Sequence, residues 1–174
     1  MILDGYWKLE LKKSIDAMRF WRKAAGVIHT DFTDHQVNRQ ILYSAVIVRK
    51  IIEDEKWAKN ALKDSTLPMP PFAILHSEIN MIEYPYVGDK NFVAFRPWTD
   101  DYDVDGRTTG KLMLEHACNS IIHSYVWSLV RYEKKRDVAA FVCASDRYKS
   151  NCMYLIMLDE WLDKLQFCLD NCHV

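Results

Sequence analysis

Residues 108–132 read TTGKLMLEHACNSIIHSYVWSLVRY, and the fold predicted for the whole chain depends on this stretch. Apolar side chains recur in it at steps of three and four residues, which is typical of one face of an amphipathic helix. We therefore predict a helix from Thr108 or Thr109 to about Tyr132. Its apolar face comprises Leu114, Cys118, Ile121, Ile122, Tyr125 and Leu129.

Two long helices are predicted before this stretch. The first runs from about Asp4 to Gly26 and has an apolar stripe at the same spacing. The second begins at Thr33, where Thr33 and Gln36 have the form of a capping box, and ends near Lys63. The stripe of the first helix is Trp7, Leu11, Ile15, Met18, Trp21, Ala25 and Ile28.

The remaining segments are predicted to be irregular or extended. Three prolines at 68, 70 and 71 exclude helix, and short strands are expected near 73–82 and 92–95. Residues 139–144 and 152–158 are typical of a hairpin, and Asp159 is placed to cap a closing helix. The predicted fold class is mostly α: a bundle of three long helices with an irregular insertion and a C-terminal β-hairpin plus helix. A single domain is expected over 1–174, made of a helical pair (1–67), the insertion (68–107) and a C-terminal part (108–174).

The composition excludes several classes of protein. The chain has 174 residues, 49% of them hydrophobic, and a net charge of −1, so no strong basic field organises it. None of its five glycines belongs to a phosphate-binding loop motif. The five cysteines form no C-x-x-C pair and are odd in number, which predicts reduced thiols in a cytoplasmic protein. The longest apolar run, 152–158, is too short to cross a membrane. We expect no cofactor, no bound metal and no membrane partner.

The polar side of the predicted third helix carries the residues best suited to chemistry. At 100° per residue, Thr109, His116, Asn119, Ser120 and His123 fall within one arc opposite the apolar face. Imidazole can act as both acid and base near neutral pH, and a nearby amide can orient it or hold a phosphate oxygen. His116 and His123 lie two turns apart, about 10 Å, which is too far to share one metal ion. The alternative interpretation is a solvated helix face that contains two histidines.

The second helix adds a cation. Arg49 and Glu53 are four residues apart and can form a surface ion pair. If this helix packs beside the third one, Arg49 could instead bind an anion near His123, because a guanidinium grips phosphate in a fork.

Two charged segments allow two interpretations each. Asp101, Asp103, Asp105 and Gly106 match the first half of a calcium-binding loop, although its twelfth position is Leu112 and not a glutamate. The alternative is an acidic surface loop preceding the third helix. Six basic residues suit either a nucleic-acid backbone or simple solubility: Arg131, Lys134, Lys135, Arg136, Arg147 and Lys149.

Residues 114–124 resemble the signature helix of HEPN domains, with Asn119 and His123 at the matching spacing. The resemblance implies a helical fold and an RNA-directed, metal-independent ribonuclease of a prokaryotic defence or toxin system. It also implies a homodimer whose motif helices line a shared cleft. Residues 48–53 and the hairpin are similar to a group of uncharacterised bacterial proteins.

The hypothesis of an RNA-directed protein gives roles to four residues, of which the resemblance itself carries Asn119 and His123. His123 would be the acid–base group, Asn119 would orient it, Arg49 would offset the phosphate charge and His116 would be a second proton carrier. Cys118 occupies the position of the family's arginine. This difference favours the alternative function, a non-catalytic module that binds a partner protein or a second copy of itself.

Overall fold

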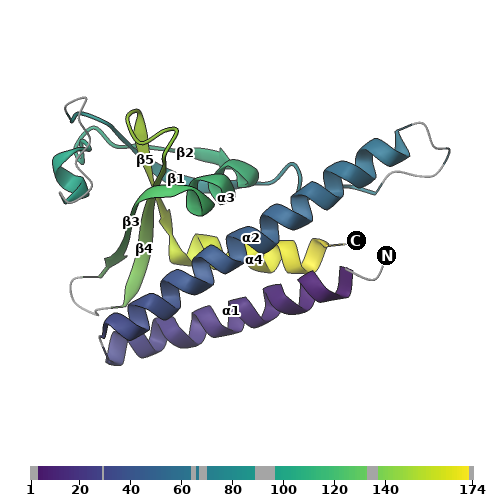
Figure 1. The fold of residues 1–174 in the computed structure, drawn as a ribbon, viewed down its shortest axis with the longest axis horizontal. Coiled ribbons are helices and arrows are strands. Elements are labelled where there is room, and N and C mark those ends of the chain that lie inside the picture. The colour runs from purple at the N-terminus through teal and green to yellow at the C-terminus, as the bar shows by residue number, and fades with distance from the viewer. Residues whose placement is uncertain are drawn as a thin grey trace.

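The computed structural model describes residues 4–28, 30–63, 66, 70–88, 97–132 and 137–172. Helices α1 (Asp4–Val27), α2 (Asp31–Leu62) and α4 (Leu158–Asn171) pack together beside an antiparallel sheet (Figure 1). A short helix, α3 (Leu114–Ile122), lies between α2 and the sheet, and a 3-10 turn, η1, covers Trp98–Asp100. The strands are β1 (Glu78–Pro85), β2 (Thr108–Met113), β3 (Ser124–Arg131), β4 (Val138–Ser145) and β5 (Cys152–Met157), in the spatial order β2-β1-β5-β4-β3.

The two long N-terminal helices are confirmed, but the cap of the second is not the predicted one. Thr30 is the N-cap residue of α2: its hydroxyl accepts from the Thr33 N–H, and the Thr33 hydroxyl accepts from the Thr30 N–H, both at 3.2 Å. The helix therefore begins before Thr33, and the proposed pairing of Thr33 with Gln36 is wrong. The buried Thr33 hydroxyl also donates to the Ile28 carbonyl, which joins the end of α1 to the start of α2.

The predicted bundle of three long helices is wrong, because residues 108–132 divide into β2, α3 and β3. Within β3, Trp127 and Leu129 face the helices, whereas Val126 and Val130 face the opposite side of the sheet. This alternation, together with aromatic and β-branched residues, favours a strand. Pairing with β4, where Leu129 lies opposite Phe141, stabilises that strand. The apolar residues of 124–131 fit the helical spacing of three and four, but they also fit the alternating spacing of a strand. The sequence prediction therefore extended the helix through a segment that forms a strand.

The C-terminal prediction is largely confirmed. Strands β4 and β5 pair as an antiparallel hairpin, and α4 follows. The N-cap residue of α4 is Met157 and not Asp159. Asp159 lies in the first turn and accepts from the Arg22 guanidinium of α1, while Arg22 Nε donates to the Val138 carbonyl at 3.1 Å.

The insertion is less irregular than predicted. Strand β1 overlaps the second half of the expected strand at 73–82, and it lies inside the sheet, next to the edge strand, because it pairs with both β2 and β5. The expected strand at 92–95 lies outside the described residues.

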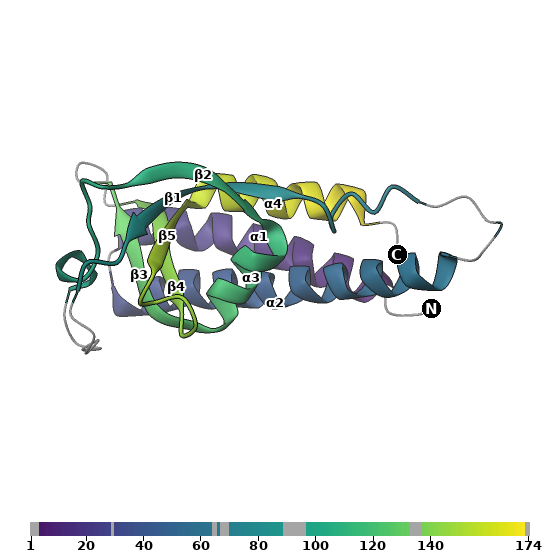
Figure 2. The same ribbon diagram turned by 90° about the horizontal axis from the view of Figure 1, so that it is seen from above.

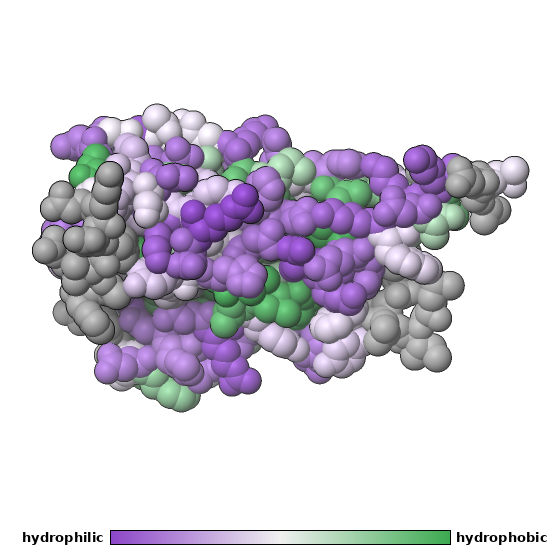
Figure 3. Space-filling view, turned by 45° about the horizontal axis from the view of Figure 1, so that its top comes forward, coloured by the Kyte–Doolittle hydropathy of each residue, from purple (hydrophilic) through white to green (hydrophobic). Residues whose placement is uncertain are grey.

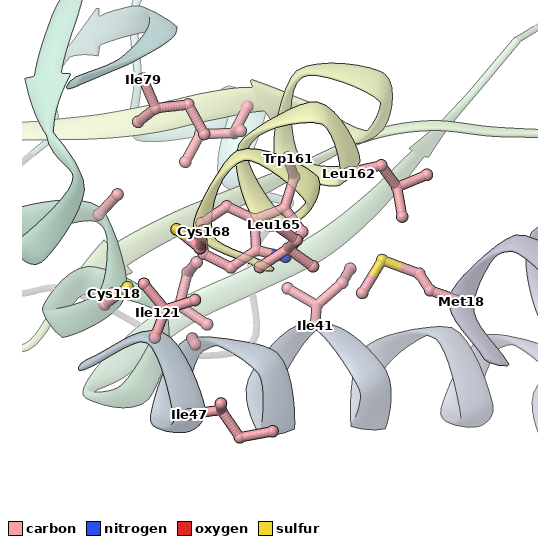
Figure 4. Packing of buried hydrophobic residues seen from close by; sticks show 14 of the residues in the cluster. Met18, Ile41, Ile47, Ile79, Cys118, Ile121, Trp161, Leu162, Leu165 and Cys168 are labelled. Atoms are coloured by element: carbon pink, nitrogen blue, oxygen red, sulfur yellow. The ribbon is translucent and has the colours of Figure 1, made fainter. Parts of the chain in front are cut away.

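Every residue of β4 is buried, so both faces of the sheet are covered at this strand. One face packs against the helices, where Trp161 and Leu165 of α4 meet Ile41 of α2 (Figure 4). The other face packs against the segment around η1, through Tyr102, Trp98 and Val104. Seen from above, α1, α2 and α4 run side by side beneath the strands, and α3 lies beside the middle of α2 (Figure 2).

Candidate functional site

Helix α3 separates its apolar and polar side chains as the sequence predicts. Leu114, Ala117, Cys118 and Ile121 are buried in the core. His116 and His123 are exposed, and His123 is the C-cap residue, whose N–H donates to the Asn119 carbonyl at 3.0 Å. Because α3 is wedged between α2 and the sheet, only its polar side is available to a ligand.

The polar side of α3 forms one wall of a pocket of about 650 Å³. Three of the four predicted site residues, His116, Asn119 and His123, line it. The opposite wall is the end of β4 and the turn that follows. The complete lining is Leu112, His116, Asn119, Ser120, His123, Ser145, Asp146, Arg147, Tyr148 and Tyr154.

A backbone hydrogen bond holds the two walls together. The Asp146 N–H donates to the His123 carbonyl at 3.1 Å, at the point where α3 ends and β3 begins. The turn itself is tight, since the N–H groups of Tyr148 and Lys149 both donate to the Ser145 carbonyl at 3.0 and 2.9 Å. The turn therefore has a defined position relative to the two histidines.

The turn contributes charge and an aromatic ring to the pocket. Arg147 is exposed, and its guanidinium carbon lies 5.5 Å from the centre of the Tyr148 ring. Tyr148 is 40% exposed. Lys149 pairs with Asp146 at 2.5 Å and lies 3.6 Å from the centre of the Tyr125 ring. Tyr154 also lines the pocket, and burial raises the pKa of its hydroxyl, which keeps it a neutral hydrogen-bonding group.

Arg49 lies next to the site, but it does not line the pocket. Its Nη1 donates to Asn119 Oδ1, its Nε donates to Glu53 at 3.1 Å, and its Nη2 lies 3.7 Å from Glu115. Both interactions considered for Arg49 from the sequence are thus present: it pairs with Glu53 and it contacts α3. The carboxylates of Glu53 and Glu115 already offset the charge of Arg49. The contribution of Arg49 to the site is therefore its hydrogen bond to Asn119. With Oδ1 occupied, the Asn119 amide has its NH2 group left to donate to a ligand.

Glu115 connects α3 to α2 through a second cation. Lys56 Nζ donates to Glu115 at 2.6 Å, and this hydrogen bond, with the nearby charges of Lys56 and Arg49, lowers the pKa of the Glu115 carboxyl. A lowered pKa in the folded state means that the ionised carboxylate stabilises the fold above the unfolded pKa, about 4.3. That stabilisation is lost as the pH falls through the folded pKa.

We therefore expect Glu115→Gln to lower the free energy of unfolding at pH 7 by about 1 kcal/mol, and this deficit to disappear as the pH falls below about 4. Urea denaturation of both proteins at pH 7, 5 and 3 measures the difference. Glu78→Gln is the matched control, because Glu78 is exposed and its nearest cation, Lys111, is 3.8 Å away. A deficit that stays constant from pH 7 to 3 would contradict the role of the Glu115 charge.

Cys118 cannot replace the arginine of the HEPN motif. Its side chain is fully buried in the core, and burial raises the pKa of its thiol well above the usual value. The thiol therefore remains neutral and contributes no positive charge. All five cysteines are buried.

The structure describes the acidic segment and part of the basic set that the sequence singled out. Asp103 Oδ1 accepts from the N–H groups of Asp105 and Gly106 at 3.0 and 2.9 Å, so this carboxylate closes a turn. Among the described residues, no three His, Cys, Asp or Glu side chains are grouped so as to hold a metal ion. Of the six basic residues, Arg131 pairs with Asp34 and Arg147 alone lines the pocket, while Lys134, Lys135 and Arg136 lie outside the described residues.

The sequence pattern missed the wall of the pocket opposite α3. Thr109, which the helical period placed beside His116, belongs to β2 and lines a different pocket. Ser120 was on the predicted arc and is a lining residue, although it is buried. Arg147 was one of the six basic residues considered for a nucleic-acid backbone, and Tyr148 was only a residue of the turn between two strands. No local pattern connects that turn to α3.

Comparison of the chain with protein-family models, curated proteins and solved structures gave no match. Among the described helices, none combines the length and apolar character required to span a bilayer.

Proposed function

We propose that the pocket between α3 and the β4–β5 turn binds a phosphodiester of RNA and cleaves it by acid–base catalysis. The observation that carries this proposal is that one pocket is lined by two exposed histidines, an amide and an exposed arginine. Its volume, about 650 Å³, is within the range of small-ligand sites.

The polar residues have complementary roles in this proposal. Arg147 pairs with a non-bridging phosphate oxygen, and the Asn119 NH2 group, held by Arg49 on its oxygen side, donates to the same phosphate. Arg49 is thus a positioning residue for Asn119 and not a direct phosphate ligand. Tyr148 offers an exposed aromatic face on which a base can stack.

The histidines supply the proton transfers. The neutral imidazole of one takes the proton of the ribose 2′-hydroxyl while that oxygen attacks phosphorus. The protonated imidazole of the other gives its proton to the leaving 5′-oxygen. The bond between phosphorus and the 5′-oxygen breaks, and the products are a 2′,3′-cyclic phosphate and a 5′-hydroxyl. Roughly 10 Å separates the two positions along the chain, which leaves room for a phosphate between the rings.

The test is cleavage of a mixed-sequence single-stranded RNA by the full chain in the presence of a chelator. The proposal expects products that end in 2′,3′-cyclic phosphate, at a rate with a bell-shaped pH profile that reports one acid and one base. If RNA binds but remains uncut, the catalytic part is wrong. If RNA does not bind, the assignment of the ligand is wrong as well.

A second candidate function is RNA binding without cleavage. It is favoured by the pairing of Arg49 with Glu53 and Glu115, and by the neutral thiol of Cys118, which together leave α3 without an available cation. In that case Arg147→Ala weakens RNA binding. RNA remains uncut by the wild-type protein and by variants of either pocket histidine.

A further inference from the structure

The outward face of α2 has a regular set of side chains that the proposed function does not use. At 100° per residue, nine residues of α2, Val46 included, fall within about 40° of the direction of Val46, and seven of the nine lie between positions 35 and 57. We call this set the α2 face: His35, Arg39, Leu42, Val46, Lys50, Glu53 and Trp57. Leu42, Val46 and Trp57 are 45%, 43% and 69% exposed. The surface shown in Figure 3 has several hydrophobic areas, and the broadest lies near the centre of the view, bordered by hydrophilic side chains. None of the seven residues lines the pocket beside α3.

The spacing of the α2 face is the same in both directions from Val46. The steps are four, three and four residues toward His35, and four, three and four toward Trp57. An 11-residue repeat corresponds to 3.67 residues per turn, close to the 3.6 of a straight helix, so the face does not drift around α2. Two copies of α2 can therefore pack antiparallel over this length, with a two-fold axis at Val46.

Such a pairing brings complementary groups together. Arg39 lies seven residues before Val46 and Glu53 seven residues after it, so each arginine of one copy meets a glutamate of the other. Glu53 already accepts from Arg49 of its own chain, and its second oxygen can accept from the second copy's Arg39. Lys50 lies opposite Leu42, where its apolar stem can cover the leucine. Val46 meets Val46 of the second copy on the axis.

The groove beside α2 accommodates the largest exposed side chain of the face. Trp57 lies eleven residues after Val46, so the second copy's Trp57 falls opposite His35. His35 lies at the edge of a groove of about 390 Å³ between α2, α3 and β3. The groove is lined by His35, Asn38, Arg39, Leu42, Ile121, Ile122, Ser124 and Trp127. An exposed tryptophan on one copy and a largely apolar groove on the other are the two halves of an interface anchor.

We infer that two copies of this chain associate through antiparallel α2 helices, with Trp57 of each copy inserted into the groove of the other. The same surface patch serves both partners, as a two-fold interface requires. The pocket of each copy that contains His116 and His123 remains separate from this contact, because none of its lining residues belongs to the α2 face or to the groove.

Sedimentation equilibrium of the full chain over a range of concentrations tests the interface. The wild-type protein is expected to sediment as a dimer. Trp57→Ala is expected to raise the dimer dissociation constant on the order of 30-fold or more, as loss of a central anchor does. Val46→Glu places two like charges together on the axis and is expected to give a monomer. Leu9→Ala, at an exposed apolar position of α1, is the control and should leave the dimer unchanged.

A charge exchange makes the test specific to the antiparallel arrangement. Arg39→Glu alone sets acidic groups against each other and should weaken the dimer, whereas adding Glu53→Arg to the same chain should restore it. Circular dichroism confirms that each variant is folded. A wild-type protein that remains monomeric, a dimer that survives Val46→Glu, or a double variant weaker than Arg39→Glu alone each overturns the inference. RNA cleavage plays no part in these measurements, so the interface and the proposed function can fail separately.

Discussion

Replacing His123 with alanine is expected to lower the rate of RNA cleavage by about 100- to 10,000-fold, which is the usual contribution of a general acid or base. The side chain is exposed at the end of α3, and the backbone hydrogen bond from its N–H to Asn119 does not depend on the imidazole. The variant should therefore fold normally while one proton transfer is lost. Initial rates with a labelled single-stranded RNA, together with thermal denaturation of both proteins, measure the two effects.

His76→Ala is the matched control for this substitution. His76 is also exposed, but its ring lies 3.2 Å from Lys59 Nζ, away from the pocket beside α3. Its removal should leave cleavage unchanged. His116→Ala should also lower the rate, because in the proposed mechanism the second proton transfer depends on this histidine. Cleavage by His123→Ala at the wild-type rate would show that the activity comes from elsewhere, including from a contaminating nuclease.

Trp161→Ala is expected to have the largest effect on stability, a loss of about 3–5 kcal/mol in the free energy of unfolding. The Trp161 ring is fully buried between α2 and the sheet, and it packs edge-to-face on Phe141 at 6.1 Å between ring centres. Its Nε1 donates to the Ser44 hydroxyl at 3.1 Å. The substitution leaves a large cavity where α1, α2, α4 and β4 meet. Urea denaturation monitored by far-UV circular dichroism measures the loss.

Trp161→Phe separates the two contributions. It keeps most of the apolar volume and removes the N–H donor, and the Ser44 hydroxyl retains its own bond to the Ile41 carbonyl at 2.9 Å. We expect it to lose less than half as much stability as the alanine variant. If Trp161→Ala stays within about 1 kcal/mol of wild type, the side chain does not fill the core as described, because buried aromatic truncations cost more than that.

Segments held together by local contacts have the structure that their spacing predicts, whereas segments that depend on distant contacts do not. Stripes such as Leu11, Ile15 and Met18 arise from contacts along one helix, so α1 and α2 could be recognised from spacing alone. The β4–β5 hairpin is also local, with a short turn between two apolar runs. Residues 124–131 are different, because their side chains fit either period. Their choice of strand depends on pairing with β4, which comes later in the chain.

The candidate site divides in the same way. His116, Asn119 and His123 share a surface because α3 is helical, and that spacing is readable in the sequence. The contact of Arg49 with Asn119 joins positions 70 residues apart. The sequence predicts a place for Arg49 near the site only if the second helix packs beside the third. Arg147 and Tyr148 could not be assigned to the site, since their position depends on the bond from the Asp146 N–H to the His123 carbonyl.

The sequence by itself determined the long helices, the C-terminal hairpin and the polar side of α3, because each follows from the hydrophobic period and the caps of a short segment. The tertiary structure decided that residues 108–132 form strand, helix and strand, since only pairing across the sheet distinguishes two periods that one segment can satisfy. It also decided that a turn of β4–β5 closes the pocket and that Arg49 holds Asn119. Contacts between distant segments depend on how whole elements pack, and no local pattern of residues records them.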